Sequence, residues 1–144
     1  MSWIYPEAAR REPSIVDRRW EAVATADPAR EYLALLSYLP LRGYRGTLAL
    51  FRRSQAVGAQ LANTPGLIGF TFRAKILGHR FWTLSVWEDE QALMAFVGRD
   101  PHLGTMDALR PRMGDVGFFR WRVRGTEVPL AWDDAMHHAD PKSA

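Results

Sequence analysis

Residues 81–96, FWTLSVWEDEQALMAF, decide the fold, because an alternating aromatic strand passes without a linker into a helix with an acidic start. In the strand, Trp82, Leu84 and Val86 alternate with residues on the opposite side, which is the two-residue period of an extended chain. After Trp87 the apolar residues change to helical spacing. The three acidic residues that follow place negative charge at a helix N-terminus, where it is favourable.

The segments on either side complete an order of strand, helix, strand, strand, helix and strand. Strands are expected at residues 31–39, 67–76, 80–87 and 116–124, and helices before 63–66, over 89–98 and from 100 to about 111. This order predicts an α+β fold, the ferredoxin-like βαββαβ arrangement with a four-stranded antiparallel sheet. Its helices can cover only one face of that sheet.

The ferredoxin-like domain is expected over residues 31–126, between two segments of a different character. Residues 1–30 are interrupted by prolines and predict an N-terminal arm with one short helix at 15–25. Trp3, Tyr5 and Trp20 are expected to pin this arm to the body. Residues 127–144 are expected to form a C-terminal tail, anchored by Leu130 and Trp132.

Composition narrows the class of protein. With 144 residues, 47% hydrophobic and 24% charged, the chain is long enough for one globular domain with an ordinary core. The net charge is +3, but the basic residues are scattered among acids without a recognised motif, so we expect no nucleic-acid partner. No apolar run at the N-terminus is long enough for a signal peptide or a membrane span, so we expect a cytoplasmic location and no membrane partner. The absence of cysteine excludes disulfides and thiolate metal ligands.

Apolar residues lie on both faces of the expected strands. Phe119, Trp121 and Val123 share one face of the last strand, while Phe118 lies on the other. Helices that cover one face leave such residues exposed, and large exposed apolar surfaces mark interfaces. We therefore predict a homodimer that pairs sheet to sheet through the last strand.

Residues 64–102, TPGLIGFTFRAKILGHRFWTLSVWEDEQALMAFVGRDPH, resemble the antibiotic-biosynthesis-monooxygenase group of dimeric α+β-barrel proteins. The resemblance rests on the Pro65-Gly66 start of the second strand, the acidic exit after Trp87, and the helix that carries Leu93 and Phe96. It implies a dimeric α+β barrel. It also implies one of the activities of that group, which include cofactor-independent oxygenation of aromatic polyketides, haem degradation and isomerisation.

The haem-degrading branch of that group has a tryptophan on the helix after the third strand and, ten residues later, a histidine that binds iron. The corresponding residues here are Phe96 and Met106. The branch also has an asparagine on the first strand, where this chain offers Leu36, Ser37 or Tyr38. The resemblance therefore leaves two cofactor expectations open: none, or haem bound through His102.

His102 is the predicted catalytic residue. It shares a helical face with Met106, Leu109 and Met113 and lies in the first turn of its helix. The helix dipole there lowers the pKa of a histidine and favours the neutral form, which can accept a proton or bind a metal. The alternative is a packed histidine bonded to a backbone carbonyl.

The expected ligand pocket is aromatic. Tyr38 could hydrogen-bond a phenol or ketone oxygen, and Arg73 could stabilise an enolate or carboxylate. Core packing is the alternative for the aromatic residues, and solvent exposure or an interfacial salt bridge is the alternative for Arg73. The side chains expected to bind substrate are Tyr38, Arg73, Trp82, Trp87, Phe96 and Met106.

The remaining histidines predict no metal site. His137 and His138 are adjacent and lack the spacing that places two ligands on one helical face, and His79 is expected to be exposed in a turn. The leading functional hypothesis is a monooxygenase-like enzyme of secondary metabolism that acts on a hydrophobic, aromatic or polyunsaturated substrate, with His102 as base. The alternatives are a haem protein with His102 as ligand and a non-catalytic dimeric ligand-binding module.

Overall fold

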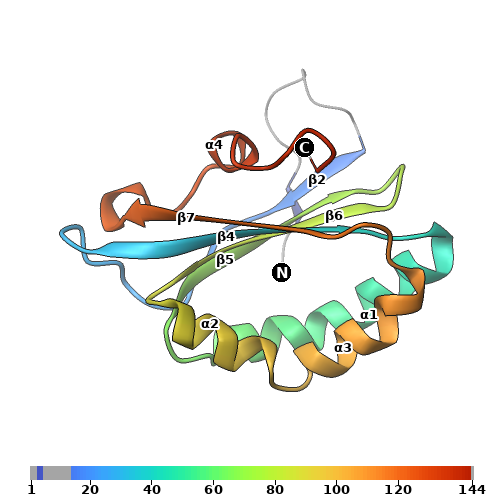
Figure 1. Cartoon of the computed structure of the whole chain (residues 1–144), viewed down its shortest axis with the longest axis horizontal. Coiled ribbons are helices and arrows are strands. Elements are labelled where there is room, and N and C mark those ends of the chain that lie inside the picture. Colours follow the sequence, from blue (N-terminus) through green and yellow to red (C-terminus); the bar gives the residue numbers. More distant parts are fainter. Residues whose placement is uncertain (1–2, 5–13, 144) are drawn as a thin grey trace.

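The computed structural model describes residues 3–4 and 14–143, in which seven strands form one antiparallel sheet. Three helices cover one face of this sheet and a fourth, short helix lies on the other (Figure 1). The strands are β1 Trp3–Ile4, β2 Ile15–Arg18, β3 Glu21–Ala22, β4 Glu31–Pro40, β5 Leu67–Lys75, β6 Arg80–Trp87 and β7 Gly117–Arg124. The helices are α1 Gly43–Ala62, α2 Glu90–Val97, α3 His102–Leu109 and α4 Trp132–Met136, with 3₁₀ turns at Arg110–Arg112 and Gly125–Glu127.

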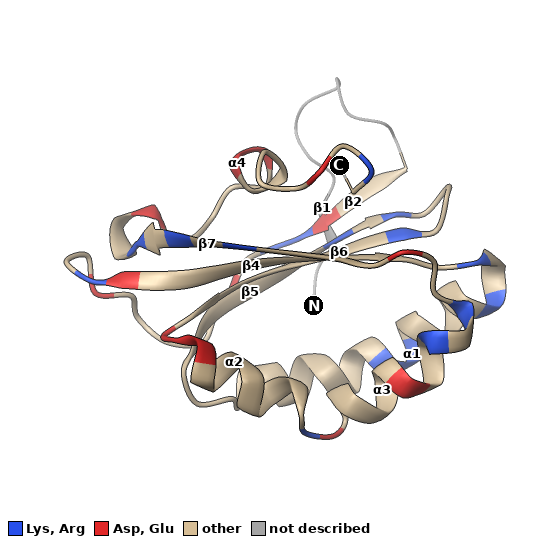
Figure 2. Ribbon diagram, in the orientation of Figure 1, with Lys and Arg blue, Asp and Glu red and all other residues tan. Residues whose placement is uncertain are grey.

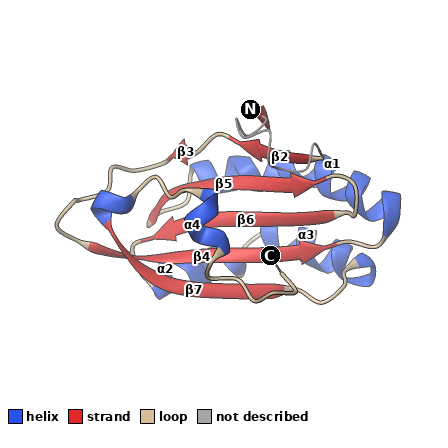
Figure 3. Ribbon diagram, turned by 90° about the horizontal axis from the view of Figure 1, so that it is seen from above, coloured by secondary structure: helices blue, strands red, loops and turns tan. Residues whose placement is uncertain are grey.

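The central four strands confirm the ferredoxin-like prediction. They are neighbours in the order β5-β6-β4-β7, and each pair is antiparallel. Figure 3 shows these strands side by side, with the three long helices on the far side and α4 crossing the near side. The sheet is thus a layer between α1–α3 and the C-terminal segment.

The strand–helix junction that decides the fold is formed as expected. β6 ends at Trp87, and Asp89 caps α2 by accepting a hydrogen bond from the Ala92 N–H at 2.8 Å. The Phe96 ring packs on Trp87 with 5.4 Å between ring centroids. Both side chains are buried, so their structural role is confirmed.

The expected helix at 15–25 is wrong. Ile15 and Val16 instead belong to β2, which pairs with the edge of β5, and β3 pairs with the same strand further along. β-Branched residues fit a pleated edge well, and pairing removes an open sheet edge. The sheet therefore has seven strands, with the predicted four at its centre.

The N-terminal arm is held partly as expected. Trp20 lies so close to Gly69 that a Cβ atom built there would be 2.5 Å from the indole nitrogen, so only glycine fits. Tyr5 and the side chain of Trp3 lie outside the described residues.

A β-bulge changes which residues of β5 face the helices. The sequence predicts Ile68 on the same face as Phe70 and Phe72, but the register with β6 shifts between Leu67 and Gly69. Ile68 consequently packs with the residues under the C-terminal segment, whereas Phe70 packs under the helices. A bulge places one extra residue in a strand and so reverses the alternation beyond it.

The face of the sheet opposite the long helices is covered by the chain itself. Trp132 and Ala135 of α4 are buried against Leu36 and Leu84, with Leu130 packed beside them. This confirms the expected anchoring of the tail. It also means that much of the apolar surface behind the homodimer prediction is buried within one chain.

The homodimer itself stays a prediction. Of the residues expected at its interface, Val123 is buried within the chain, but Phe118 remains 65% exposed on the edge strand.

Figure 2 shows basic residues at several separate places, on α1, along β7 and near the β5–β6 hairpin. Among the described residues, no helix has the length and apolar character needed to cross a bilayer.

Candidate functional site

A cavity of about 1050 Å³ lies between the helices α1–α3 and the sheet. Such a volume is large enough for a flat ligand of several fused rings. Most of its walls are apolar, and the helices contribute Val57, Leu61, Phe96 and Met106. The described chain thus encloses a hydrophobic site on the helix side of the sheet.

The floor of the cavity has a polar centre. Ser37 of β4 is paired with Thr83 of β6, and Thr83 is in turn paired with Phe72 of β5, so the three form a row across the strands. Ser85, two residues along β6, accepts a hydrogen bond from the Trp87 indole N–H at 2.8 Å. The two strands thus place a row of hydroxyl groups between aromatic rings. Each hydroxyl is able to donate to or accept from a ligand oxygen.

His102 reaches the cavity from the first residue of α3, as predicted. Its Nδ1 lies 3.3 Å from the Val97 carbonyl oxygen, and its ring contacts Phe96 with 4.9 Å between centroids. A carbonyl only accepts hydrogen bonds, so Nδ1 carries the proton and Nε2 carries a lone pair. Among the described residues, Nε2 has no recorded hydrogen-bond partner.

The backbone of His102 is also fixed. Its N–H donates to Oε1 of Gln60 on α1 at 2.9 Å, which joins the start of α3 to α1. The Asp100 side chain accepts from the Gly104 N–H at 2.9 Å and so satisfies a second donor in the first turn. These bonds hold the imidazole at the cavity wall before any ligand binds.

Burial lowers the pKa of His102, and the hydrogen bond to the Val97 carbonyl opposes this shift without cancelling it. The direction agrees with the prediction, although desolvation takes the place of the helix dipole as the main cause. His102 is therefore neutral at pH 7, with Nε2 able to accept a proton.

This shift predicts a pH dependence of stability. The unfolded chain has an ordinary histidine pKa of about 6.5, so it binds a proton that the folded chain resists. The free energy of unfolding should therefore decrease as the pH falls from about 6.5 toward the lower folded-state pKa. Urea unfolding of the parent and of His102→Gln at pH 7.5 and 5.5 measures it, and the variant should lose less stability on acidification. His137→Gln controls for removal of one histidine, and an unchanged slope in His102→Gln would contradict the assignment.

The structure brings together four of the residues predicted for the site. Trp87, Phe96, His102 and Met106 all line the cavity. Phe96 and Met106, where the resemblance places functional residues of the haem-degrading branch, both line the same cavity as His102.

The other three predicted residues border the cavity, but their side chains lie on the opposite face of the sheet. Tyr38 and Trp82 pack there with Trp132, and the Arg73 guanidinium lies over the Trp132 ring. Tyr38 accepts a hydrogen bond from Arg80 at 2.9 Å, and the Trp82 indole donates to the Ser143 carbonyl at 2.7 Å. Arg73 forms two hydrogen bonds with Asp17, at 2.6 and 2.8 Å. Strand alternation is the reason, since Trp82 and Trp87 are an odd number of residues apart and must point to opposite faces.

Sequence reasoning missed several residues that line this cavity. Thr83 and Ser85 had a signal, because they alternate with Phe81 and Trp87 on one face of a strand. Ser37 is one of the three candidates for the position of the haem-branch asparagine, but it is not among the predicted pocket residues. Arg18 and Glu21 had none, because they lie in the segment expected to be helical.

The remaining histidines have structural contacts. His79, expected to be exposed, is half-buried, and its Nδ1 lies 2.7 Å from the Thr47 hydroxyl. His138 stacks on Trp121 with 3.9 Å between parallel rings. Within the described part of the chain, no group of three or more metal-binding side chains could hold an ion.

No protein-family profile and no curated protein sequence matches the chain. Solved structures do: SnoaB, a cofactor-independent oxygenase from Streptomyces nogalater, has 18% identity, covers 62% of this chain and 92% of its own, and gives a TM-score of 0.51. The chain has the antibiotic-biosynthesis-monooxygenase-like fold. PA3566 from Pseudomonas aeruginosa is similar as well, with 17% identity, 64% and 93% coverage and a TM-score of 0.56. So is Rv0793 from Mycobacterium tuberculosis, with 13% identity, 62% and 92% coverage and a TM-score of 0.56.

These similarities concern the fold, because all three identities are low. They span most of each neighbour but leave more than a third of this chain without a counterpart. The structural neighbours include monooxygenases, among them an oxygenase that needs no cofactor.

Proposed function

We propose that the chain is an oxygenase that acts without a cofactor on an aromatic or polyunsaturated substrate with an acidic C–H or O–H bond. The observation that carries the proposal is the neutral imidazole of His102, whose Nε2 has no partner in the described chain and whose ring lies at the wall of an apolar cavity. The likeness to SnoaB supports the reaction class.

The proposed reaction begins when Nε2 of His102 accepts a proton from a CH₂ group that is conjugated with an aromatic ketone through the ring system. The resulting carbanion passes one electron to O₂, and the two radicals combine to a peroxide. The O–O bond of the peroxide then breaks as the carbon loses its second hydrogen, which leaves with the outer oxygen as hydroxide and gives a carbonyl. The proton held by His102 converts that hydroxide to water. One CH₂ and one O₂ thus become C=O and H₂O, so the substrate supplies every electron.

The surroundings of His102 suit this chemistry. A mostly apolar wall favours the neutral base over the charged one, and the hydroxyls of Ser37 and Thr83 offer hydrogen bonds to an oxygen of the substrate. The Val97 carbonyl holds the Nδ1 proton and so stabilises the imidazolium that forms during the reaction.

Oxygen uptake with anthrone, an aromatic ketone with an acidic CH₂ group, tests the proposal. The purified chain should consume one O₂ for each anthraquinone formed, faster than the uncatalysed reaction, and neither EDTA nor added flavin should change the rate. An oxygen electrode and the absorbance of the quinone measure both quantities. No acceleration with anthrone or with related phenols would contradict the proposal.

Haem bound through His102 is the second candidate, favoured by the same partner-free Nε2 and by the volume of the cavity. An absorption spectrum of protein purified from haem-supplemented cells distinguishes the two candidates. A Soret band that disappears in His102→Gln would support haem binding. If neither a Soret band nor turnover appears while aromatic ligands still bind, the chain is a ligand-binding module.

A further inference from the structure

Arg18 is a buried cation in the wall of the cavity, contributed by β2 rather than by the four central strands. Its side chain is 3% exposed, and its Nη1 has no hydrogen-bond partner among the described residues. Buried guanidinium nitrogens without a partner are rare, because leaving such a donor unsatisfied costs stability.

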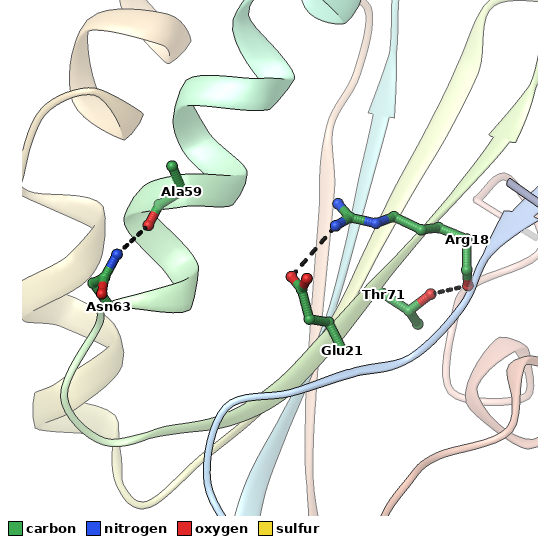
Figure 4. Close-up of polar contacts among 5 residues, drawn as sticks. All are labelled: Arg18, Glu21, Ala59, Asn63 and Thr71. Carbon is green, nitrogen blue, oxygen red and sulfur yellow. Dashed lines mark hydrogen bonds and ion pairs between the residues drawn. The ribbon is translucent and has the colours of Figure 1, made fainter. Parts of the chain in front are cut away.

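The Arg18 side chain is held in place from several sides. The Thr71 hydroxyl donates to the Arg18 carbonyl at 2.5 Å, and the guanidinium carbon lies 5.5 Å and 5.3 Å from the ring centroids of Phe70 and Phe72. Figure 4 shows the Arg18 and Glu21 side chains directed toward one another, with α1, which carries Ala59, at the left of the view. The arginine is thus positioned by contacts of its backbone carbonyl, its Nη2 and the flat face of its guanidinium. None of these contacts uses Nη1, which remains available as a hydrogen-bond donor.

Glu21 determines which kind of ligand oxygen suits Nη1. Its carboxylate lies 3.3 Å from Arg18 Nη2 and already balances the positive charge. A second carboxylate would be repelled by Glu21, whereas an uncharged carbonyl oxygen accepts a hydrogen bond without adding charge. Burial lowers the pKa of Arg18 and the Glu21 carboxylate opposes this shift, but a guanidinium keeps its proton at any pH of interest.

We infer that Arg18 is a specificity-determining residue that binds the ketone oxygen of a flat aromatic ligand through Nη1. The aromatic rings of the ligand would lie in the cavity beside the guanidinium, which itself lies against the Phe70 and Phe72 rings. The hydroxyl groups of Ser37, Thr83 and Ser85 on the cavity floor would lie next to the ligand. The inference deepens the proposed function by naming the residue that binds the ketone oxygen of the substrate. It rests on the proposed function only in taking the cavity as the substrate site, because a ligand can bind there without being turned over.

A binding comparison under nitrogen, where no oxygenation occurs, tests this inference separately from catalysis. Anthrone and 9,10-dihydroanthracene have the same three-ring frame but differ in the ketone oxygen. Tryptophan fluorescence should show that the parent binds anthrone at least about tenfold more tightly, since a hydrogen bond to a charged group contributes that much or more. In Arg18→Met, which keeps the length of the side chain, the two ligands should bind equally and the hydrocarbon as in the parent.

Arg30→Met, at an exposed arginine outside the cavity, is the matched control and should keep the preference for the ketone. Arg18→Met should unfold at no lower urea concentration than the parent, because it removes an unsatisfied buried donor; if it does not fold, Arg18→Lys replaces it and should lower the preference. The inference would be overturned if the Arg18 variant still preferred anthrone, or if its affinity for both ligands fell equally. Failure of oxygen uptake together with a ketone preference that depends on Arg18 would reject the oxygenase and retain the binding site.

Discussion

The His102→Gln variant is expected to fold like the parent and to consume oxygen with anthrone at least about 10²-fold more slowly, the effect typical of a lost acid–base group. Glutamine is similar in size, and its amide can donate to the Val97 carbonyl as Nδ1 does now. It has no lone pair of comparable basicity to take the place of Nε2. The loss should therefore appear in kcat, measured with the oxygen electrode, while the urea unfolding midpoint at pH 7.5 stays close to that of the parent.

His137→Gln is the control for this substitution, because His137 is an exposed residue of the C-terminal segment. It should retain full activity. If His102→Gln is also fully active, the bond between Nδ1 and the Val97 carbonyl is the whole role of His102, and the packed-histidine alternative holds. In the parent, kcat/KM should decrease as the pH falls through the lowered pKa of His102, because protonation removes the acceptor.

Breaking the buried ion pair between Asp17 and Arg73 is expected to lower the free energy of unfolding by about 3–5 kcal/mol. Both residues are 6% exposed, and the guanidinium also lies 4.7 Å from the centroid of the Trp132 ring. Asp17→Asn keeps the shape of the side chain but leaves a buried positive charge without a full counter-charge. Urea denaturation measures the loss, with the linear extrapolation applied to both chains.

The same substitution at Asp107 provides the control. Asp107 forms a pair with Arg110 at 3.1 Å, but the two side chains are 57% and 73% exposed. Asp107→Asn should cost less than about 1 kcal/mol, since solvent screens exposed pairs. Equal, small losses at both positions would show that the charge of Asp17 contributes little to the stability of the sheet.

Local sequence signals account for the core of the fold and for half of the site. The alternation in residues 81–87 and the acid cap that follows identify β6 and α2, since both depend on neighbours a few residues apart. The placement of His102 with Met106 on one helical face is local as well, and it brings both to the cavity. Side chains alternate between the two faces of a strand, so Trp82 and Trp87 cannot both face the cavity. A strict use of this rule would have excluded Trp82 from the predicted pocket residues.

Tertiary structure alone decided the rest. Residues 15–18 and 21–22 become strands because β5, far along the chain, offers an unpaired edge, and no local pattern indicates that edge. The bulge before Gly69 reverses the faces of β5, and α4 covers a sheet face that the sequence left to a partner chain. By itself the sequence determined the strand and helix order of the central domain and the position of His102. The set of side chains that meet in the cavity, which includes Arg18, depends on strand pairing between segments far apart in the sequence. The strand that pairs with an edge strand decides which of its faces is buried, and that partner lies far along the chain.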